Sequence, residues 1–201
     1  MGKVLIAYTT HSGSTTEVAK AIGEELGKQA AEGEILRIEE IATLEPNAAV
    51  VIGAPMMMGW HRTAVKFVKV HQDALSRVPV VYFFNAMRLT QTPEKTVASV
   101  PIYVDANLAK PPKKAGHLSF KERYATPANY LKAALKAAPH VKQVSAAFFG
   151  GRLDLFRLKW WAMLFVMVVV QASPGEFRNG PAIREWAASL PPLLTKSDRP
   201  D

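Results

Sequence analysis

The sequence predicts an α/β fold in which a parallel sheet is covered by helices on both faces. Apolar runs of strand length alternate along the chain with amphipathic segments of helix length, which is the pattern of repeated strand–helix–strand units. The run at residues 78–84 is apolar throughout rather than alternating, as expected for a strand that is buried on both faces. With 201 residues, of which 49% are hydrophobic, the chain has the length and composition of a single globular domain.

The expected strands and helices alternate regularly from the N-terminus onward. Each strand is a short apolar run, and each helix carries apolar residues at three- and four-residue spacing. Strands are predicted at residues 4–8, 34–38, 50–54, 78–84 and 143–149, and helices at residues 14–29, 63–76, 126–137 and 181–190.

The first predicted helix has the clearest pattern. Val18, Ile22 and Leu26 recur every four residues and define a buried face, while charged residues occupy the remaining surface. Ser14 and Glu17 have the spacing of a capping box at the start of this helix.

The turn before this helix is rich in hydroxyl groups and holds one glycine. Unpaired N–H groups and the dipole at a helix start attract anions, hydroxyls add donors, and glycine lets the backbone approach an oxyanion closely. The spacing matches neither the Walker A pattern nor the dinucleotide pattern GxGxxG. The turn therefore predicts a phosphate site, and the alternative is a polar loop that only caps the helix. Its residues are Thr9, Thr10, His11, Ser12, Gly13, Ser14 and Thr15.

This turn resembles the FMN phosphate loop of flavodoxins, which has a Thr/Ser-x-Thr-Gly-x-Thr type motif. His11 and Ser12 depart from the usual residues of that motif but leave its hydroxyl donors in place. Residues 148–154, 173–179 and 182–187 resemble the flavodoxin-domain family that contains the menaquinone-dependent protoporphyrinogen oxidase. The resemblance covers most of the chain and weakens between residues 98 and 124.

The resemblance implies a fold. A flavodoxin-like three-layer sandwich has a five-stranded parallel sheet in the order 2-1-3-4-5, here with an insertion near the last strand. Ligands of such sheets bind at the carboxyl ends of strands 1 and 3. We expect one domain over residues 1–190, with a basic insertion at 88–125, an apolar Trp-rich insertion at 152–175 and a frayed tail at 191–201.

The resemblance also implies FMN as cofactor, framed by the loops that follow the strands. Trp60 is the candidate for stacking on the flavin ring, and the alternative is a core or rim tryptophan. His11 and His61 are weak catalytic candidates as proton relays. The further residues expected at the cofactor are Pro55, Met56, Met57, Met58, Gly59, Asn85, Ala86, Met87, Arg88, Leu89, Thr90, Gly150 and Gly151.

Composition excludes several kinds of chemistry. The chain has no cysteine, which excludes disulfides, thiolate metal sites and thiol catalysis, so a redox role requires a bound cofactor. His71, His117 and His140 show no metal-ligand spacing with carboxylates, and no metal is expected. Few apolar residues precede Thr9, which argues against a signal peptide and for a cytoplasmic protein.

The net charge of +8 favours anionic partners. No nucleic-acid-binding motif is visible, so nucleic acid is not an expected partner. The anionic partners that remain are a lipid headgroup layer and a carboxylate-bearing substrate.

Two segments exceed a minimal five-stranded domain. Residues 88–123 carry seven basic and three acidic residues, and are either a solvated loop or a patch that faces an anion or a membrane. Residues 160–170 are eleven consecutive apolar residues, fewer than the roughly 20 that a membrane span needs. They form a buried helix, a self-association face that would make a homo-oligomer, or a peripheral insertion into a membrane.

Three functions are compatible with these patterns. The first is an FMN-dependent oxidoreductase of the protoporphyrinogen oxidase type, which passes electrons to a quinone at the inner face of the cell membrane. The second is an FMN electron carrier that serves a redox protein partner. The third is a flavodoxin-shaped interaction module without flavin.

Overall fold

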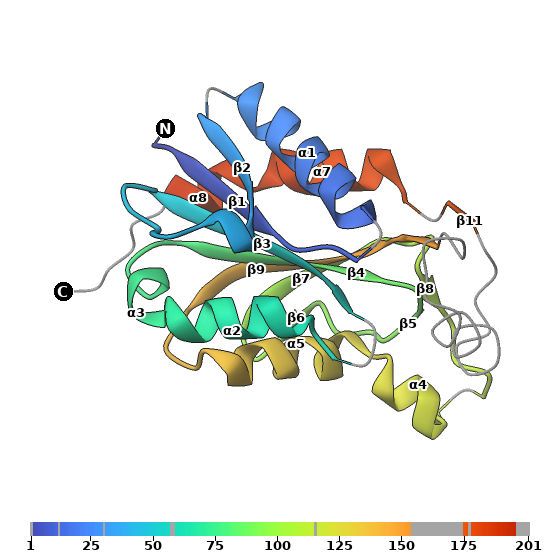
Figure 1. Ribbon diagram of the computed structural model, residues 1–201. Coiled ribbons are helices and arrows are strands. Elements are labelled where there is room, and N and C mark those ends of the chain that lie inside the picture. Colours follow the sequence, from blue (N-terminus) through green and yellow to red (C-terminus); the bar gives the residue numbers. More distant parts are fainter. Residues whose placement is uncertain are drawn as a thin grey trace.

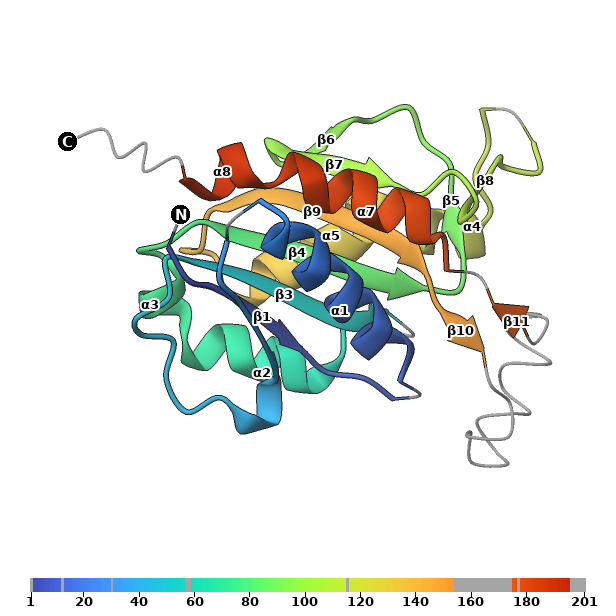
Figure 2. The same cartoon turned by 90° about the horizontal axis from the view of Figure 1, so that it is seen from above.

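The computed structural model describes residues 2–11, 13–29, 31–56, 59–114, 116–153, 175–176 and 178–195. A central sheet is covered by helices on both faces (Figures 1 and 2). One face carries α1, α7 and α8, and the opposite face carries α2, α3 and α5. These helices span Ser14–Gly27 (α1), Arg62–Val70 (α2), Gln72–Leu75 (α3), Pro127–Ala137 (α5), Gly180–Ser189 (α7) and Pro191–Thr195 (α8).

The sheet has seven strands in the order β2-β1-β3-β4-β9-β7-β6. Its first five strands are parallel and confirm the predicted order 2-1-3-4-5. They are β1 (Val4–Tyr8), β2 (Gly33–Arg37), β3 (Ala49–Met56), β4 (Val80–Ala86) and β9 (Gln143–Gly150).

The predicted strand count of five is wrong, because the basic insertion adds two strands beyond β9. Strand β7 (Val100–Val104) pairs parallel with β9, and β6 (Thr96–Val97) pairs antiparallel with β7. The insertion is therefore part of the sheet rather than only a solvated loop. Its apolar residues Val97 and Val100 are buried, which explains why the segment folds onto the sheet edge.

Several short elements complete the fold. Strand β5 (Leu89–Thr90) pairs with β8 (Ala109–Lys110), and β10 (Arg152–Leu153) pairs with β11 (Gly175–Glu176). Helix α4 spans Phe120–Tyr124, and the 3₁₀ helix η1 spans Ile38–Glu40. Most of the apolar insertion, including residues 160–170, lies outside the described residues.

Two apolar clusters fill the space between the sheet and its two helix layers. Tyr82 and Phe84 of β4 point to the cluster under α2 and α5, whereas Val81 and Phe83 point to the cluster under α1 and α7. Successive residues of a strand face opposite sides of a sheet. This alternation explains why the run at 78–84 is apolar at every position.

Three predicted boundaries require correction. The helix predicted at 63–76 is divided at His71 into α2 and α3. Gly13, with a φ of +89°, is the N-cap of α1, so Ser14 is already helical and the capping box with Glu17 is wrong. Residues 191–195 were expected to fray but form α8, because Leu194 is buried against the cluster under α1 and α7.

Within the described parts of the chain, no helix is long and apolar enough to cross a membrane.

Candidate functional site

The carboxyl ends of β1, β3, β4 and β9 share one edge of the sheet, on the right in Figure 1. The loops that follow these four strands carry the predicted cofactor residues. The edge therefore brings together positions that lie up to about 140 residues apart in the sequence, as expected for a parallel sheet with crossover helices.

The start of α1 presents hydrogen-bond donors at this edge. The hydroxyl of Thr10 accepts a bond from the N–H of Gly13 at 2.9 Å, which closes the turn. The N–H groups of Thr16 and Glu17 bond to the carbonyl of Gly13. Ser14 and Thr15 precede these residues, and the first N–H groups of a helix have no intrahelical acceptor.

The hydroxyl of Thr15 is the clearest indication of a ligand at this site. Its side chain is fully buried, and its Oγ1 has no hydrogen-bond partner in the described structure. A buried hydroxyl without a partner is unfavourable by about 1–3 kcal/mol. An anion seated at the start of α1 would satisfy this hydroxyl together with the neighbouring N–H groups.

Thr9 is an expected cofactor residue, but its hydroxyl bonds within the protein. Its side chain is buried, and its hydroxyl donates a bond of 2.9 Å to Glu39 Oε1. Burial raises the pKa of Glu39, but bonds from the backbone and from Thr9, together with the charge of Arg37, outweigh burial and lower the pKa. Glu39 is not an expected site residue, since its position in η1 gives no local signal in the sequence.

His11 and His61 lie side by side, although they come from the loops after β1 and β3. Their ring centroids are 4.3 Å apart in an edge-to-face arrangement. His61 is the N-cap of α2, where its Nδ1 accepts a bond of 3.3 Å from the N–H of Thr63. Burial, followed by the charge of His11, lowers the pKa of His61, and Glu39 opposes this shift. The neutral imidazole with its proton on Nε2 is therefore favoured at His61.

Trp60 lies in the core rather than at the surface. Its side chain is 5% exposed, and its ring contacts Tyr82 and Phe84 at centroid distances of 5.0 and 5.4 Å. Met56 is also buried and forms a bridge with Trp60 across the loop, whose Gly59 has a φ of +119°. This arrangement matches the alternative of a core tryptophan and does not present the ring for stacking.

Ser12, Met57 and Met58 are expected cofactor residues that lie outside the described residues. Pro55 is the second-last residue of β3, and its carbonyl accepts a bond from the N–H of His61. The loop between Pro55 and His61 is therefore closed on itself by backbone contacts.

The ends of β4 and β9 are joined by a side chain. Asn85 is buried, and its Nδ2 donates a bond of 3.3 Å to the carbonyl of Gly150. Its Oδ1 is buried without a partner. Asn85 thus offers an unused acceptor at the same edge as the unused donor of Thr15.

Gly151 brings three loops into contact. A Cβ at this position would lie 3.6 Å from Ser14 Oγ and 3.8 Å from Met87 Sδ. The loops after β1, β4 and β9 therefore converge here, as the predicted residues require.

The remaining predicted residues of the loop after β4 are turned toward the insertion. Leu89 and Thr90 are buried in β5. The hydroxyl of Thr90 donates to the carbonyl of Glu122, and its N–H donates to the carbonyl of Ala125. Ala86 is buried, and the carbonyl of Arg88 accepts a bond from the Tyr130 hydroxyl at 3.5 Å. Leu89 and Thr90 therefore serve packing in this structure.

Arg178 is a residue that the sequence pattern missed. It forms an ion pair with Glu17 in the first turn of α1. Its side chain is 18% exposed, although it is more than 160 residues away from α1 along the chain. A guanidinium thus pairs with the first turn of α1, and no spacing in the sequence could have indicated this.

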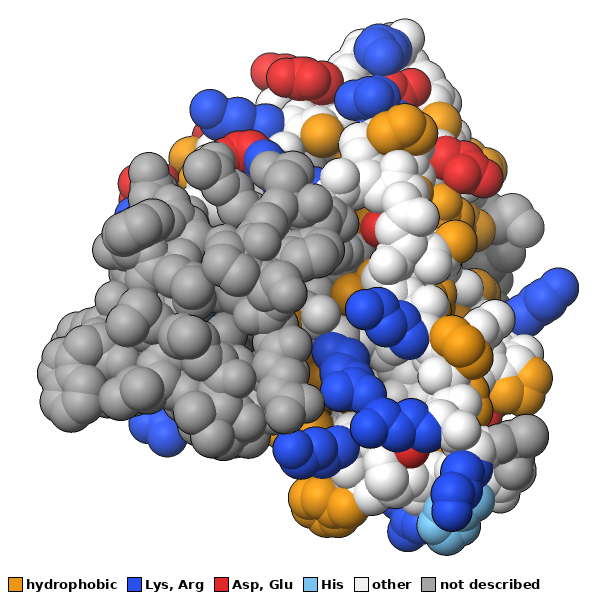
Figure 3. All heavy atoms as spheres, turned by 90° about the vertical axis from the view of Figure 1, so that its right-hand side faces the viewer, with side chains coloured by type: hydrophobic (Ala, Val, Ile, Leu, Met, Phe, Trp, Pro, Cys, Tyr) orange, Lys and Arg blue, Asp and Glu red, His pale blue; other side chains and the backbone are white. Residues whose placement is uncertain are grey.

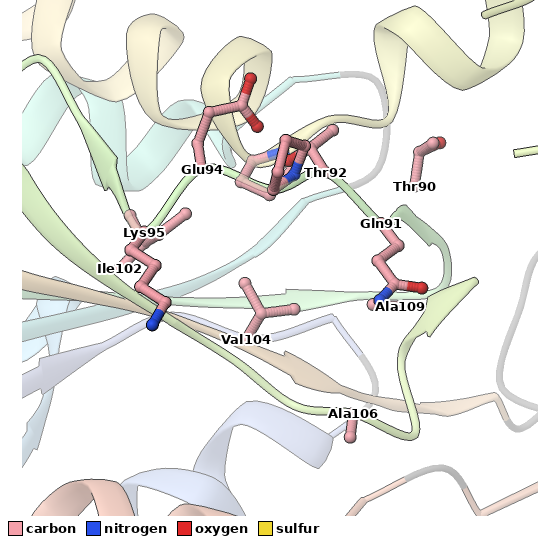
Figure 4. A pocket seen from close by; sticks show the side chains of 11 residues that line it. Thr90, Gln91, Thr92, Glu94, Lys95, Ile102, Val104, Ala106 and Ala109 are labelled. Atoms are coloured by element: carbon pink, nitrogen blue, oxygen red, sulfur yellow. The ribbon is translucent and has the colours of Figure 1, made fainter. Parts of the chain in front are cut away.

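A separate cavity of about 370 Å³ lies within the basic insertion (Figure 4). Ile102 and Val104 line it from β7, and Gln91 and Lys95 line it from the segment that follows β5. Only Thr90 of the predicted site belongs to it. The cavity is thus lined almost entirely by residues outside the expected site.

The residues at the carboxyl edge fit a phosphate group at one end and a polar ring at the other. Ser14 and Thr15 supply donors, Asn85 supplies an acceptor, and Gly151 leaves space between them. Thr9 donates its hydroxyl proton to Glu39, whereas Thr10 accepts a bond from Gly13 and keeps its own proton to donate. Among the described residues, no group of three or more His, Asp or Glu side chains could hold a metal ion.

Comparisons with known proteins bear on the family and the fold of the chain. The family model of the flavodoxin domain matches residues 5–178. The protein named protoporphyrinogen IX dehydrogenase [quinone], from Escherichia coli strain K12, is 34% identical over 105 residues, which are 50% of this chain and 57% of that protein. The chain thus spans little more than half the length of these curated relatives, and proteins of the same name from two other Escherichia coli strains give the same values.

Solved structures resemble the whole fold at low identity. A flavoprotein from Thermotoga maritima is 15% identical with a TM-score of 0.50, covering 96% of this chain and 36% of the other. A flavo di-iron protein mutant from the same organism is 14% identical with a TM-score of 0.50 and the same coverage. These two likenesses support the flavodoxin-like fold.

Proposed function

Because the chain belongs to the flavodoxin-domain family, we propose that it binds FMN at the carboxyl edge of its sheet and acts as an oxidoreductase. The observation that carries this proposal is the buried, unpartnered hydroxyl of Thr15 at the start of α1. A phosphate group would accept bonds from this hydroxyl and from the N–H groups of Ser14 and Thr15.

The other loops of this edge would hold the ring of the cofactor. Asn85 Oδ1 would accept a bond from a ring N–H, and Gly151 would leave room for the ring beside Ser14 and Met87. Bound flavin supplies the hydride and single-electron chemistry. His61 would keep a neutral imidazole beside His11 at the mouth of the loops, where it could exchange a proton with solvent.

We further propose a substrate and an acceptor of the kind that the relative's name gives. The protein would take hydrogen from a protoporphyrinogen and pass electrons to a quinone, with peripheral membrane contact through residues 160–170. The basic net charge supports an anionic substrate and an anionic membrane surface. The alternative is an FMN electron carrier for a redox protein.

Titration of the purified protein with FMN tests the cofactor proposal. We expect flavin absorbance to remain with the protein after gel filtration. Thr15→Val should weaken FMN binding about tenfold or more, because it removes a hydrogen bond to a charged group. The same change should stabilise the cofactor-free protein by about 1 kcal/mol, because the unpaired hydroxyl is lost.

Thr16→Val is the matched control, since it alters the next residue of the same helix and leaves the Thr15 hydroxyl in place. A protein that takes up no FMN would contradict the proposal, as would equal FMN affinities of Thr15→Val and Thr16→Val.

The substrate proposal is tested by protoporphyrin fluorescence. FMN-loaded protein is mixed with protoporphyrinogen IX and a menaquinone analogue, and we expect fluorescence to rise faster than without protein. FMN-loaded protein that shows no such rate but reduces or oxidises a redox protein would favour the electron carrier.

A further inference from the structure

Helix α4 exposes two aromatic side chains to solvent. Phe120 is 84% exposed and Tyr124 is 40% exposed. Of the large hydrophobic side chains in the described parts of the chain, only Val70 is similarly exposed. A phenylalanine exposed to this extent gains little from folding, and with Tyr124 one helical turn away it forms an apolar protrusion that a partner with an apolar environment would bury.

Basic side chains surround these two aromatics. Residues 110–124 contain five cationic residues, all of which are exposed, and one acidic residue, Glu122, which is only 3% exposed. Figure 3 shows this face, with Lys and Arg side chains gathered in its lower half near exposed hydrophobic side chains. The cationic residues are Lys110, Lys113, Lys114, Lys121 and Arg123.

The single acidic residue fixes the two basic segments against each other. Glu122 Oε2 accepts bonds from the N–H and the hydroxyl of Ser119 at 2.9 and 2.6 Å, which forms a capping box of α4. Its Oε1 accepts a bond of 2.8 Å from the N–H of Lys113. These bonds, led by the Ser119 hydroxyl, lower the pKa of Glu122 to about 2. The carboxylate is thus held inside the fold, and the five exposed cations against this one anion leave residues 110–124 with a net charge of +4.

Hydrogen bonds from β5 fix the position of α4. Thr90 of β5 bonds to the carbonyls of Glu122 and Ala125, at the middle and end of α4. The N–H of His117 bonds to the carbonyl of Lys114 and closes the turn between the two basic segments. These hydrogen bonds tie α4 and the 110–114 turn to the body of the protein, and ordered support of this kind lowers the entropy lost on binding.

We propose that α4 and the 110–114 turn form a docking surface for an anionic lipid headgroup layer. This docking surface comprises Lys110, Lys113, Lys114, Phe120, Lys121, Arg123 and Tyr124. Its cations would lie at the charged headgroups, while Phe120 and Tyr124 would enter the boundary between headgroups and acyl chains. This combination of aromatic and basic side chains is typical of interfacial membrane binding. An acidic protein face or a nucleic acid would also satisfy the charges, and these two partners are the competing outcomes of the test below.

The docking surface adjoins the carboxyl edge of the sheet. Helix α4, β5 and β8 lie on the same side of the molecule as the ends of the parallel strands (Figure 1). Binding would therefore turn that edge toward the lipid. The proposal goes beyond the function proposed above, because it requires neither flavin nor substrate, and it uses a surface distinct from residues 160–170.

Sedimentation with vesicles tests the docking surface without added FMN. The full chain is mixed with phosphatidylcholine vesicles with or without phosphatidylglycerol. We expect binding that requires phosphatidylglycerol and weakens with salt. Phe120→Ser should lower the partition coefficient roughly tenfold, and the double variant Lys113→Gln/Lys114→Gln should lower it by about twentyfold.

Two matched controls separate this surface from general charge and hydrophobicity. Val70→Ser removes the other exposed hydrophobic side chain, and Lys132→Gln/Lys136→Gln removes two exposed cations from α5. Both should bind vesicles nearly as the parent does, and circular dichroism should show all variants folded.

Three results would overturn the proposal. The first is no binding to anionic vesicles, and the second is equal loss of binding in the control and docking-surface variants. The third is binding to double-stranded DNA or polyglutamate that is tighter than binding to vesicles and indifferent to Phe120→Ser. Failure of FMN binding would leave the vesicle result unaffected, so the two proposals fail separately.

Discussion

The ring of His61 packs against a second imidazole at the mouth of the candidate site. Its folded-state pKa lies below the usual 6.5, first because of burial and then because of His11. The unfolded chain therefore binds more protons than the folded chain below about pH 6.5, and the contribution of His61 to stability is lost as the pH falls through this range.

The variant His61→Asn tests this residue, because asparagine can cap α2 as His61 does. We expect the parent protein to lose more thermal stability than His61→Asn between about pH 7 and pH 5.5. His71, whose pKa is also lowered by burial, is present in both proteins and cancels in the comparison. Parallel curves of melting temperature against pH would contradict the assignment.

For Glu122, it is the charged form that the folded protein favours, whereas for His61 it is the neutral form. Its pKa falls from 4.5 to about 2 in the folded protein, chiefly through the Ser119 hydroxyl. Its stabilising effect is complete above about pH 4.5 and is lost as the pH falls toward 2. Glu122→Gln should be less stable than the parent at neutral pH, and the difference should shrink in acid.

Denaturant unfolding of both proteins at pH 7 and at about pH 3 measures this convergence. Glu94→Gln is the control, because Glu94 is exposed and lies outside the docking surface. A difference between parent and Glu122→Gln that does not change with pH would show that the carboxylate charge is irrelevant.

Among the elements, α8 makes the sharpest stability prediction. Leu194 is 5% exposed and packs into the cluster under α1 and α7. Leu194→Ala should lower the free energy of unfolding by about 2–3 kcal/mol, because a large buried side chain is removed. Thr195→Ala, at an exposed position of the same helix, should change it by less than about 0.5 kcal/mol. Thermal or urea unfolding would measure both, and equal stabilities would mean that α8 frays in solution.

The elements also show what the sequence could and could not predict. Apolar runs and four-residue periodicity located the five parallel strands from β2 to β9 and the long helices within a few residues. The sequence predicts the wrong N-cap for α1. Ser14 and Glu17 have capping-box spacing, but the N-cap is Gly13, which has a positive φ. Strand β7 was missed since Pro101 and polar neighbours interrupt its pattern, and it is paired with β9 along only three residues.

At the scale of the molecule, the prediction of the site rests on topology rather than on local signals. Parallel order alone is enough to bring Ser14, Asn85 and Gly151 to one edge. Contacts such as Thr9–Glu39 and Arg178–Glu17 depend on tertiary packing, so no motif announces them. Trp60 was assigned to the ligand because of its chemistry, whereas packing against Tyr82 and Phe84 places it in the core.

The basic insertion is also fastened to α7. Asp105, fully buried at the end of β7, accepts a bond of 2.9 Å from Asn179, the N-cap of α7. Tyr103 of β7 donates a bond of 3.0 Å to Glu185 of α7. The basic insertion is thus anchored to the helix that follows residues 152–175 in the sequence.

The added strands also change the edge that the sheet presents to other chains. A five-stranded sheet would end in β9, an eight-residue strand whose free N–H and C=O groups invite pairing with another chain. Here β7 covers the middle of β9, and the outermost strand on this side, β6, has two residues. Pro101 beside it has no N–H to offer. The insertion therefore replaces a long free strand edge by a two-residue one, which offers fewer groups for pairing with another chain.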